Sequence, residues 1–115
     1  MIRVYVAGAY SADNVMDVLH NIGKGIEESA DLLGAGYAPF CPWLDFHFAM
    51  CNRLIPKQSF YDYSIAWLKV SQVVLVLDGW EKSIGTKKEI QLAEKLNIPI
   101  AYDLEELDEI AEDLK

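Results

Sequence analysis

At 115 residues with 52% hydrophobic side chains, the chain is long enough to bury one real core and too short for two, so a single domain over residues 1–115 is expected. A formal net charge of −8 argues against partners that require a basic surface, namely nucleic acid polymers and anionic membranes. A single small anion bound by backbone amides is still compatible with that charge.

No apolar run approaches the roughly 18 residues of a membrane span, and the first residues are typical of a strand rather than of a signal peptide. We therefore expect a cytoplasmic protein in which Cys41 and Cys51 are reduced. Together with His47 they supply three zinc ligands, but a closed structural site needs four in tighter pairs. Neither a metal nor a cofactor is expected.

The first expected strand is the apolar run from Ile2 to Ala7, which ends at Gly8. A glycine at this turn lets the backbone approach a ligand closely, so Gly8 is a candidate binding residue. Ser11 and Asp13 are ordinary helix-entry residues, although Ser11 equally fits a substrate contact. Tyr5 lies near the functional end of the strand, and its hydroxyl needs a partner if it is buried.

A long amphipathic helix is expected next. Apolar residues recur at spacings of three and four from Val15 to Leu33, and the glycines of residues 34–36 stop the pattern. A short strand from Tyr37 to Phe40 follows. The connection from Cys41 to Gln58 is rich in aromatic residues, which predicts a pocket lid or a short helix. Core packing and a dimer contact explain those aromatic residues equally well.

A second helix from Ser59 to Val70 places Asp62 in its first turn, where the helix dipole alone favours a carboxylate. The run from Val73 to Leu77 predicts a buried strand, and a third helix extends through Leu96. A strand from Ile98 to Tyr102 and a short acidic helix complete the chain. This alternation predicts an α/β fold with a parallel sheet and helices on both faces.

The loop after the Val73 to Leu77 strand carries the main candidate site. In open α/β sheets ligands bind where strands end and helices begin, because unpaired amides and the helix dipole favour anions there. Thr86 and Glu89 also fit a capping box, in which the glutamate side chain returns to the backbone of Thr86. Glu89 is therefore either a helix cap or a carboxylate that faces a pocket. The residues expected at this place are Ser83, Gly85, Thr86 and Glu89.

Several motifs together resemble the nucleoside 2-deoxyribosyltransferase-like superfamily, from the first strand to about Tyr102. The most specific is the Ser-x-Gly-x-x-x-Glu pattern that starts at Ser83. The other matching stretches are Val4 to Gly8, Gly36 to Pro39, Gly79 with Trp80, and Ile98 to Ile100.

The resemblance implies a flavodoxin/Rossmann-like three-layer sandwich with four to five parallel strands. It also implies cleavage of the N-glycosidic bond of a nucleoside or nucleotide, by hydrolysis or by deoxyribosyl transfer, with Glu89 at the position of the nucleophile. Ser83 stands where the transferase branch commonly has an aspartate and the nucleotide hydrolase branch has a serine that contacts the 5'-phosphate. A hydroxyl beside helix amides suits a phosphate, whereas a carboxylate would repel it, so a nucleoside 5'-monophosphate is favoured.

The second acid of the family matches Asp62, although an alignment anchored on Trp67 puts Ser64 at that position instead. Asp62 is expected to protonate the departing base in a pocket shielded by Trp43 or Phe46.

Tyr5 is expected to orient Glu89 by a hydrogen bond. In the hydrolase branch a serine often follows the first glycine, and because Ala9 stands there, Ser11 is expected to substitute. A neighbouring subunit completes the site in relatives, so the resemblance implies a homodimer, with Asp103 suggested as a substitute in this chain. A nucleotide-binding module without catalysis and a purely structural domain are the alternatives. The residues expected to hold the phosphate or sugar are Gly8, Ser11, Ser83, Gly85 and Thr86.

Overall fold

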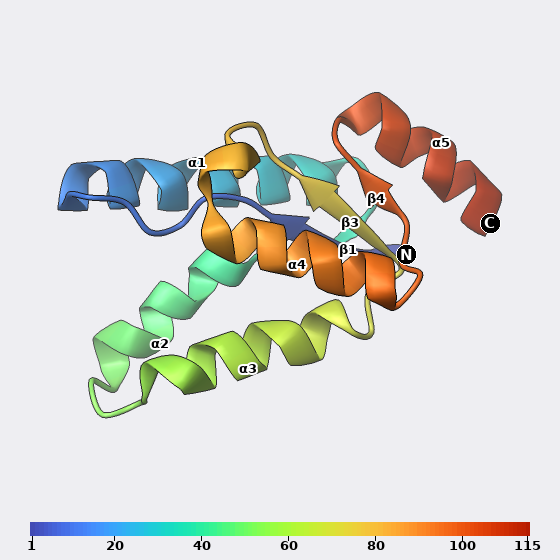
Figure 1. Ribbon diagram of the computed structural model, residues 1–115. Coiled ribbons are helices and arrows are strands. Elements are labelled where there is room, and N and C mark those ends of the chain that lie inside the picture. The colour runs from blue at the N-terminus through green and yellow to red at the C-terminus, as the bar shows by residue number, and fades with distance from the viewer.

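The computed structural model describes residues 1–115 as an alternation of strands and helices (Figure 1). The connection between the second and third strands contains a short helix, as the sequence predicted. The strands are β1 (Arg3–Ala7), β2 (Ala38–Phe40), β3 (Val73–Val76) and β4 (Ile100–Ala101). The α-helices are α1 (Val15–Gly34), α2 (Asp45–Cys51), α3 (Lys57–Leu68), α4 (Ile84–Lys95) and α5 (Leu104–Leu114), and the 3-10 turns are η1 (Pro42–Leu44) and η2 (Trp80–Lys82).

All four strands are parallel and form one sheet in the order β2-β1-β3-β4. The chain runs outward from β1 to β2 and then returns to place β3 on the other side of β1. Where the strand order reverses in this way, the connections leave a crevice at the carboxyl ends of the two strands concerned. The expected flavodoxin/Rossmann-like α/β fold is confirmed, with four parallel strands, and the crevice lies beyond Ala7 of β1 and Val76 of β3.

Each face of the sheet has its own helical layer, because successive residues of a strand point to opposite faces. Val4 and Leu75 pack with buried residues of α1 and α5 on one face. Tyr5 and Val74 pack with buried residues of α3 and α4 on the other. Figure 1 shows α1 behind the strands and α4 in front of them. The result is the expected three-layer arrangement.

The helices α2 and α3 lie side by side and project beyond the sheet (Figure 1). Aromatic contacts tie them to β1 and β2. Tyr5 stacks on Phe40 with ring centroids 5.5 Å apart, and Phe40 contacts Tyr63 at 5.6 Å and Trp67 at 5.7 Å. Tyr63 in turn contacts Phe48 of α2 at 5.8 Å. Such pairs stabilise beyond the area that they bury, so the ring of Tyr5 is held in place from the side of α3.

Two helix starts differ from the sequence predictions. Asn14 caps α1, because its side chain both accepts from the Asp17 amide and donates to the Asp17 carboxylate, each at 2.9 Å. Ser11 and Asp13 are consequently not helix-entry residues, which leaves them in the loop after β1. The start of α3 is Lys57, two residues earlier than expected, and Asp62 lies beyond the first turn.

None of the helices has both the length and the hydropathy that crossing a bilayer requires. The longest, α1, has 20 residues and is amphipathic. Its buried face includes Ile22 and Leu32, whereas Lys24 and Glu27 are exposed. A helix of this kind packs its apolar face on a sheet.

Candidate functional site

A pocket of about 640 Å³ opens at the carboxyl ends of the strands, where the strand order reverses. Its walls come from the end of β1 and the following loop, from η1 and α2, from α3, and from the loop that leads into α4. Ligand sites in proteins typically measure roughly 300–1,000 Å³ and lie at such reversals. The pocket is therefore the candidate site.

The start of α4 decides where Glu89 points. Ser83 is the N-cap: its Oγ accepts from the Thr86 amide at 3.2 Å and from the Thr86 hydroxyl at 2.8 Å. The capping box predicted around Thr86 is wrong, because α4 already begins at Ile84 and Glu89 lies beyond its first turn. The Glu89 side chain is free of the backbone and lines the pocket instead.

Glu89 is held there by Tyr5, whose hydroxyl donates a hydrogen bond to Oε2. This is the contact that the sequence predicted. Burial raises the pKa of the Glu89 carboxyl to about 7, and the hydrogen bond from Tyr5 opposes that rise by favouring the ionised form. Burial and the charge of Glu89 raise the pKa of Tyr5 well above its ordinary value, so the hydroxyl keeps its proton and acts as a donor.

The pocket contains a second tyrosine–carboxylate pair that the sequence analysis missed. Tyr10, in the loop after β1, donates a hydrogen bond of 2.8 Å to Oδ1 of Asp45, the first residue of α2. Both side chains are partly buried and line the pocket. Burial raises the pKa of the Asp45 carboxyl, and the hydrogen bond from Tyr10 opposes that rise. Topology could have revealed Asp45, because the connection after β2 starts at the same edge of the sheet as those after β1 and β3.

Asp62 does not reach the pocket. It is exposed on α3, where it accepts a hydrogen bond of 2.9 Å from Gln58. Ser64 is buried and lines the pocket. Residues two apart on a helix point about 200° apart, so the helix face that turns Ser64 inward turns Asp62 outward. The prediction that Asp62 faces the base is therefore wrong, and the alternative position, Ser64, is the one inside.

The predicted binding residues all line the pocket, but not all of them have an N–H or O–H group free to bind a ligand. Both the amide and the hydroxyl of Thr86 are committed to Ser83, so these two residues shape the loop. The amides of Ile84 and Gly85 have no backbone partner and are available to a ligand. The predicted residues found in the lining are Gly8, Ser11, Ser83, Gly85 and Thr86.

Two lysines that the sequence analysis did not select, Lys57 of α3 and Lys82 of η2, also line the pocket. The only ion pair in the chain joins Lys115 to Glu112, so neither pocket lysine is neutralised by a carboxylate of the chain. The same lining contains the carboxyl groups of Asp13, Asp45 and Glu89, so the two lysines offer ammonium groups to an anion without making the pocket positive overall.

Trp43 forms one wall and fixes the segment around it. It is fully buried, its indole Nε1 donates to the Ala9 carbonyl at 3.1 Å, and its ring covers Gly25 of α1. A Cβ at residue 25 would lie 2.2 Å from the nearest ring carbon, so only glycine fits under the indole. Phe46, the other predicted shield, is exposed and does not line the pocket, and that prediction is wrong.

No group of three or more histidine, cysteine, aspartate and glutamate side chains could hold a metal ion. Cys41 is a buried free thiol and Cys51 an exposed one. Asp103 caps α5 by accepting a hydrogen bond of 2.8 Å from the Glu106 amide, and it does not line the pocket. Asp103 therefore does not complete the pocket of its own chain.

A protein-family model matches residues 2–102. The chain belongs to that family, described as Domain of unknown function (DUF4406). No curated protein gives a significant match to the chain. The DUF4406 stretch contains all four strands and every residue that lines the pocket, whereas α5 lies outside it. The candidate site is thus built by the DUF4406 part of the chain alone.

Proposed function

We propose that this protein cleaves the N-glycosidic bond of a nucleoside 5'-monophosphate, with Glu89 as the nucleophile. The observation that carries the proposal is the position of Glu89. Its carboxylate leaves the helix start, enters a pocket of about 640 Å³ and is held there by the Tyr5 hydroxyl. The resemblance of the Ser83 to Ile90 stretch to nucleoside 2-deoxyribosyltransferases points to the same chemistry.

A carboxylate in this position suits a sugar substrate. Breaking a C1'–N bond develops positive charge on the sugar, which a facing carboxylate stabilises and then captures as a glycosyl ester. The hydrogen bond from Tyr5 favours the ionised form of Glu89, which is the reactive one. Attack of water on the ester gives hydrolysis, and attack of a second base gives deoxyribosyl transfer.

The free amides and the two lysines of the pocket favour a substrate with a phosphate. The amides of Ile84 and Gly85 are unpaired at the positive end of the α4 dipole. Lys57 and Lys82 add two cations that no carboxylate of the chain neutralises. A phosphate is the anion that such a combination of amides and ammonium groups binds well.

Release of free base tests the proposal. Purine and pyrimidine nucleoside and deoxynucleoside 5'-monophosphates are incubated with the protein, and free base is measured by chromatography. We expect base release to fall by a factor of about 10³ or more in Glu89→Gln, because the nucleophile is lost. Asp62→Asn is the matched control: it alters an exposed carboxylate outside the pocket and should leave the rate unchanged.

Saturable nucleotide binding without base release in the wild type would contradict catalysis and support a binding module instead. Equal base release by wild type and Glu89→Gln would remove Glu89 from its role.

The phosphate preference has its own test. In the double variant Lys57→Gln with Lys82→Gln, we expect the KM for nucleotides to rise about tenfold while the KM for the corresponding nucleosides stays constant. A rise that is the same for both substrates would contradict a phosphate contact at these lysines.

A further inference from the structure

Glycosidic cleavage needs an acid as well as a nucleophile, and the sequence analysis assigned this acid to the wrong residue. The departing base accumulates negative charge, so an acid must face the side of the substrate away from Glu89. Asp62 is outside the pocket, and Ser64, which occupies the inward position on α3, carries a hydroxyl that is too weak an acid to donate readily. The proton must come from another element.

The remaining ionisable side chains of the pocket differ in exposure and in what they already bind. Asp13, Lys57, Tyr61 and Lys82 are exposed to solvent. Tyr5 lies behind Glu89 and donates its proton there, and Tyr10 donates its proton to Asp45. Asp45 is the one carboxyl other than Glu89 that is partly buried in the pocket.

Asp45 follows a segment anchored by Trp43 and has an oxygen without a hydrogen-bond partner. Trp43, two residues earlier, is fixed by its hydrogen bond to Ala9 and by its packing over Gly25. Tyr10 donates to Oδ1 of Asp45 at 2.8 Å, and no group of the chain hydrogen-bonds to Oδ2. A carboxyl anchored through one oxygen can carry a transferable proton on the other.

We propose that Asp45 is the general acid of the reaction and that Tyr10 is its positioning residue. This assignment rests on the proposed function. As Glu89 bonds to C1', the C1'–N bond breaks, its electron pair moves to the base nitrogen, and the proton on Oδ2 of Asp45 passes to the base. Water then attacks C1', gives one proton back to Asp45 and releases the Glu89 carboxylate, so the net reaction is substrate plus water to free base plus sugar phosphate.

The charge environment of Asp45 allows this cycle. Burial raises the pKa of the Asp45 carboxyl and so favours the protonated form that donates to the base, whereas the hydrogen bond from Tyr10 favours the ionised form that accepts the proton of water. The groups that line the pocket with it are the carboxylates Asp13 and Glu89, the lysines Lys57 and Lys82, and the tyrosines Tyr10 and Tyr61.

A substrate whose leaving group needs no protonation distinguishes the role of Asp45 from that of Glu89. The substrates are a deoxynucleoside 5'-monophosphate and 4-nitrophenyl 2-deoxyribofuranoside 5-phosphate, whose nitrophenolate departs without an acid. We expect Asp45→Asn to lower kcat/KM for the nucleotide by a factor of about 10²–10³ and for the nitrophenyl substrate less than about fivefold. Glu89→Gln should abolish both reactions, and Asp62→Asn should change neither.

The outcomes distinguish this role from the proposed function. Suppose that turnover depends on Glu89 but that Asp45→Asn lowers kcat/KM equally for both substrates, or for neither. The acid role of Asp45 is then overturned and the function of Glu89 stands. If the wild type releases neither base nor nitrophenolate, the proposed function fails and the role of Asp45 fails with it.

Tyr10→Phe provides a second readout that a merely structural role would not change. The hydrogen bond from Tyr10 favours ionised Asp45, so its removal should raise the pKa of Asp45 and move the basic limb of the kcat/KM profile upward by about half a pH unit to one unit. A basic limb that does not move in Tyr10→Phe would contradict the assignment of Tyr10.

Discussion

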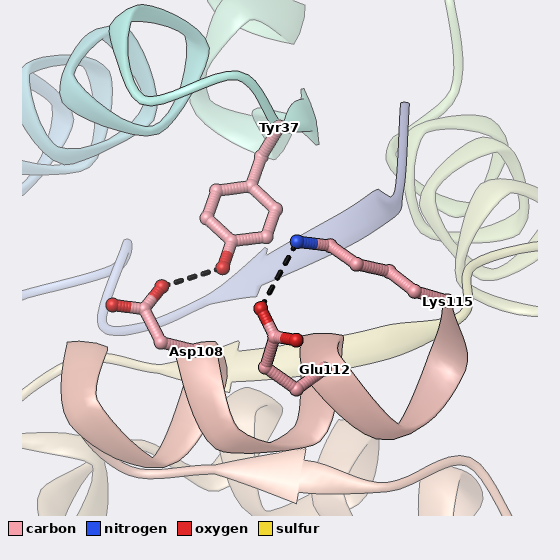
Figure 2. A network of polar contacts seen from close by, with 4 residues as sticks. All are labelled: Tyr37, Asp108, Glu112 and Lys115. Atoms are coloured by element: carbon pink, nitrogen blue, oxygen red, sulfur yellow. Dashed lines mark hydrogen bonds and ion pairs between the residues drawn. The ribbon is translucent and has the colours of Figure 1, made fainter.

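The two ends of the sheet carry the same kind of contact in different surroundings. At the carboxyl end, Tyr5 donates to Glu89 inside a pocket. At the amino end, Tyr37 donates to Asp108 of α5 at 2.5 Å, next to the ion pair between Lys115 and Glu112 (Figure 2). Partial burial and the neighbouring Asp108 raise the pKa of Tyr37 to about 12, but the carboxylates of this second group are exposed to water.

The two tyrosine–carboxylate pairs differ in the burial of the carboxylate rather than in the hydrogen bond itself. Water can solvate Asp108 and Glu112, so their charges carry little desolvation cost and gain little stabilisation from their partners. The Glu89 charge lacks that solvation, so burial raises the pKa of its carboxyl to about 7, and the hydrogen bond from Tyr5 only partly offsets this rise.

The wall of the carboxyl-end pocket should be the most sensitive to substitution. In Gly25→Ala the new methyl group would collide with the buried Trp43 ring, and we expect a loss of about 3 kcal/mol in the free energy of unfolding, together with loss of activity. Gly23→Ala is the matched control in α1, because nothing lies within 4 Å of its Cβ, and it should stabilise the helix by up to about 1 kcal/mol. Urea denaturation measures the free energy of unfolding of both variants. A change of the same sign in both would contradict the packing of Trp43 over Gly25.

Replacing each carboxylate by its amide sharpens the comparison between the two ends. For Glu89 the unfolded pKa of 4.5 is below the folded value of about 7, so the unfolded state loses its proton first. Stability therefore falls as pH rises from about 4.5 to 7, by up to about 3 kcal/mol. Glu89→Gln should recover most of that loss at about pH 8 and show little difference at about pH 4.

The control is Asp108→Asn, which should stay within about 0.5 kcal/mol of wild type at both pH values because Asp108 is exposed. Chemical denaturation at the two pH values measures these differences. If Glu89→Gln raised the free energy of unfolding equally at both pH values, burial of the ionised Glu89 carboxylate would carry no free-energy cost.

Tyrosine to phenylalanine substitution at each end gives a smaller effect on the ionisation of Glu89. Loss of the Tyr5 hydroxyl removes a bond that favours the charged carboxylate, so the pKa of Glu89 should rise and the acidic limb of base release should move upward by about one pH unit. Tyr37→Phe should leave the profile where it is. An unmoved limb in Tyr5→Phe would mean that this bond only positions the side chain.

The smallest effect is expected at the amino end itself. Lys115→Ala removes the only ion pair of the chain, whose two side chains are 65% and 73% exposed. Because exposed pairs contribute little, the free energy of unfolding should change by less than about 0.5 kcal/mol and should hardly depend on salt concentration. Thermal denaturation at low and high salt measures this, and a larger loss would show that the amino end is more than a solvated surface.

The sequence predicted the fold and the place of Glu89 at the carboxyl end of the sheet because both depend on strong local signals, but it left open whether the Glu89 side chain caps the helix or faces a pocket. The β-branched run of β3 and the three-and-four spacing along α1 each define an element by themselves. The Ser-x-Gly-x-x-x-Glu stretch follows a strand, which puts it at the carboxyl end of the sheet.

The second acid could not be predicted from such signals. Whether Asp62 or Ser64 faces inward depends on the rotation of α3 about its axis, which tertiary packing sets. Asp45 lies in a connection without periodicity, where its neighbour in space, Tyr10, is far away in the sequence. The same limit applies to the N-cap of α4. The sequence pattern fits a cap at Thr86, but in the structure Ser83 is the N-cap.

Trapping of the sugar on the protein tests the role of Glu89 most directly. A 2-deoxy-2-fluoroarabinofuranosyl nucleoside 5'-monophosphate slows the second step, because fluorine at C2' destabilises the positive charge on the sugar. Intact-mass measurement should then show one added sugar phosphate, with peptide mapping placing it on Glu89 and no adduct forming on Glu89→Gln. Release of base by the wild type with no adduct, or with an adduct on another residue, would contradict a covalent role for Glu89.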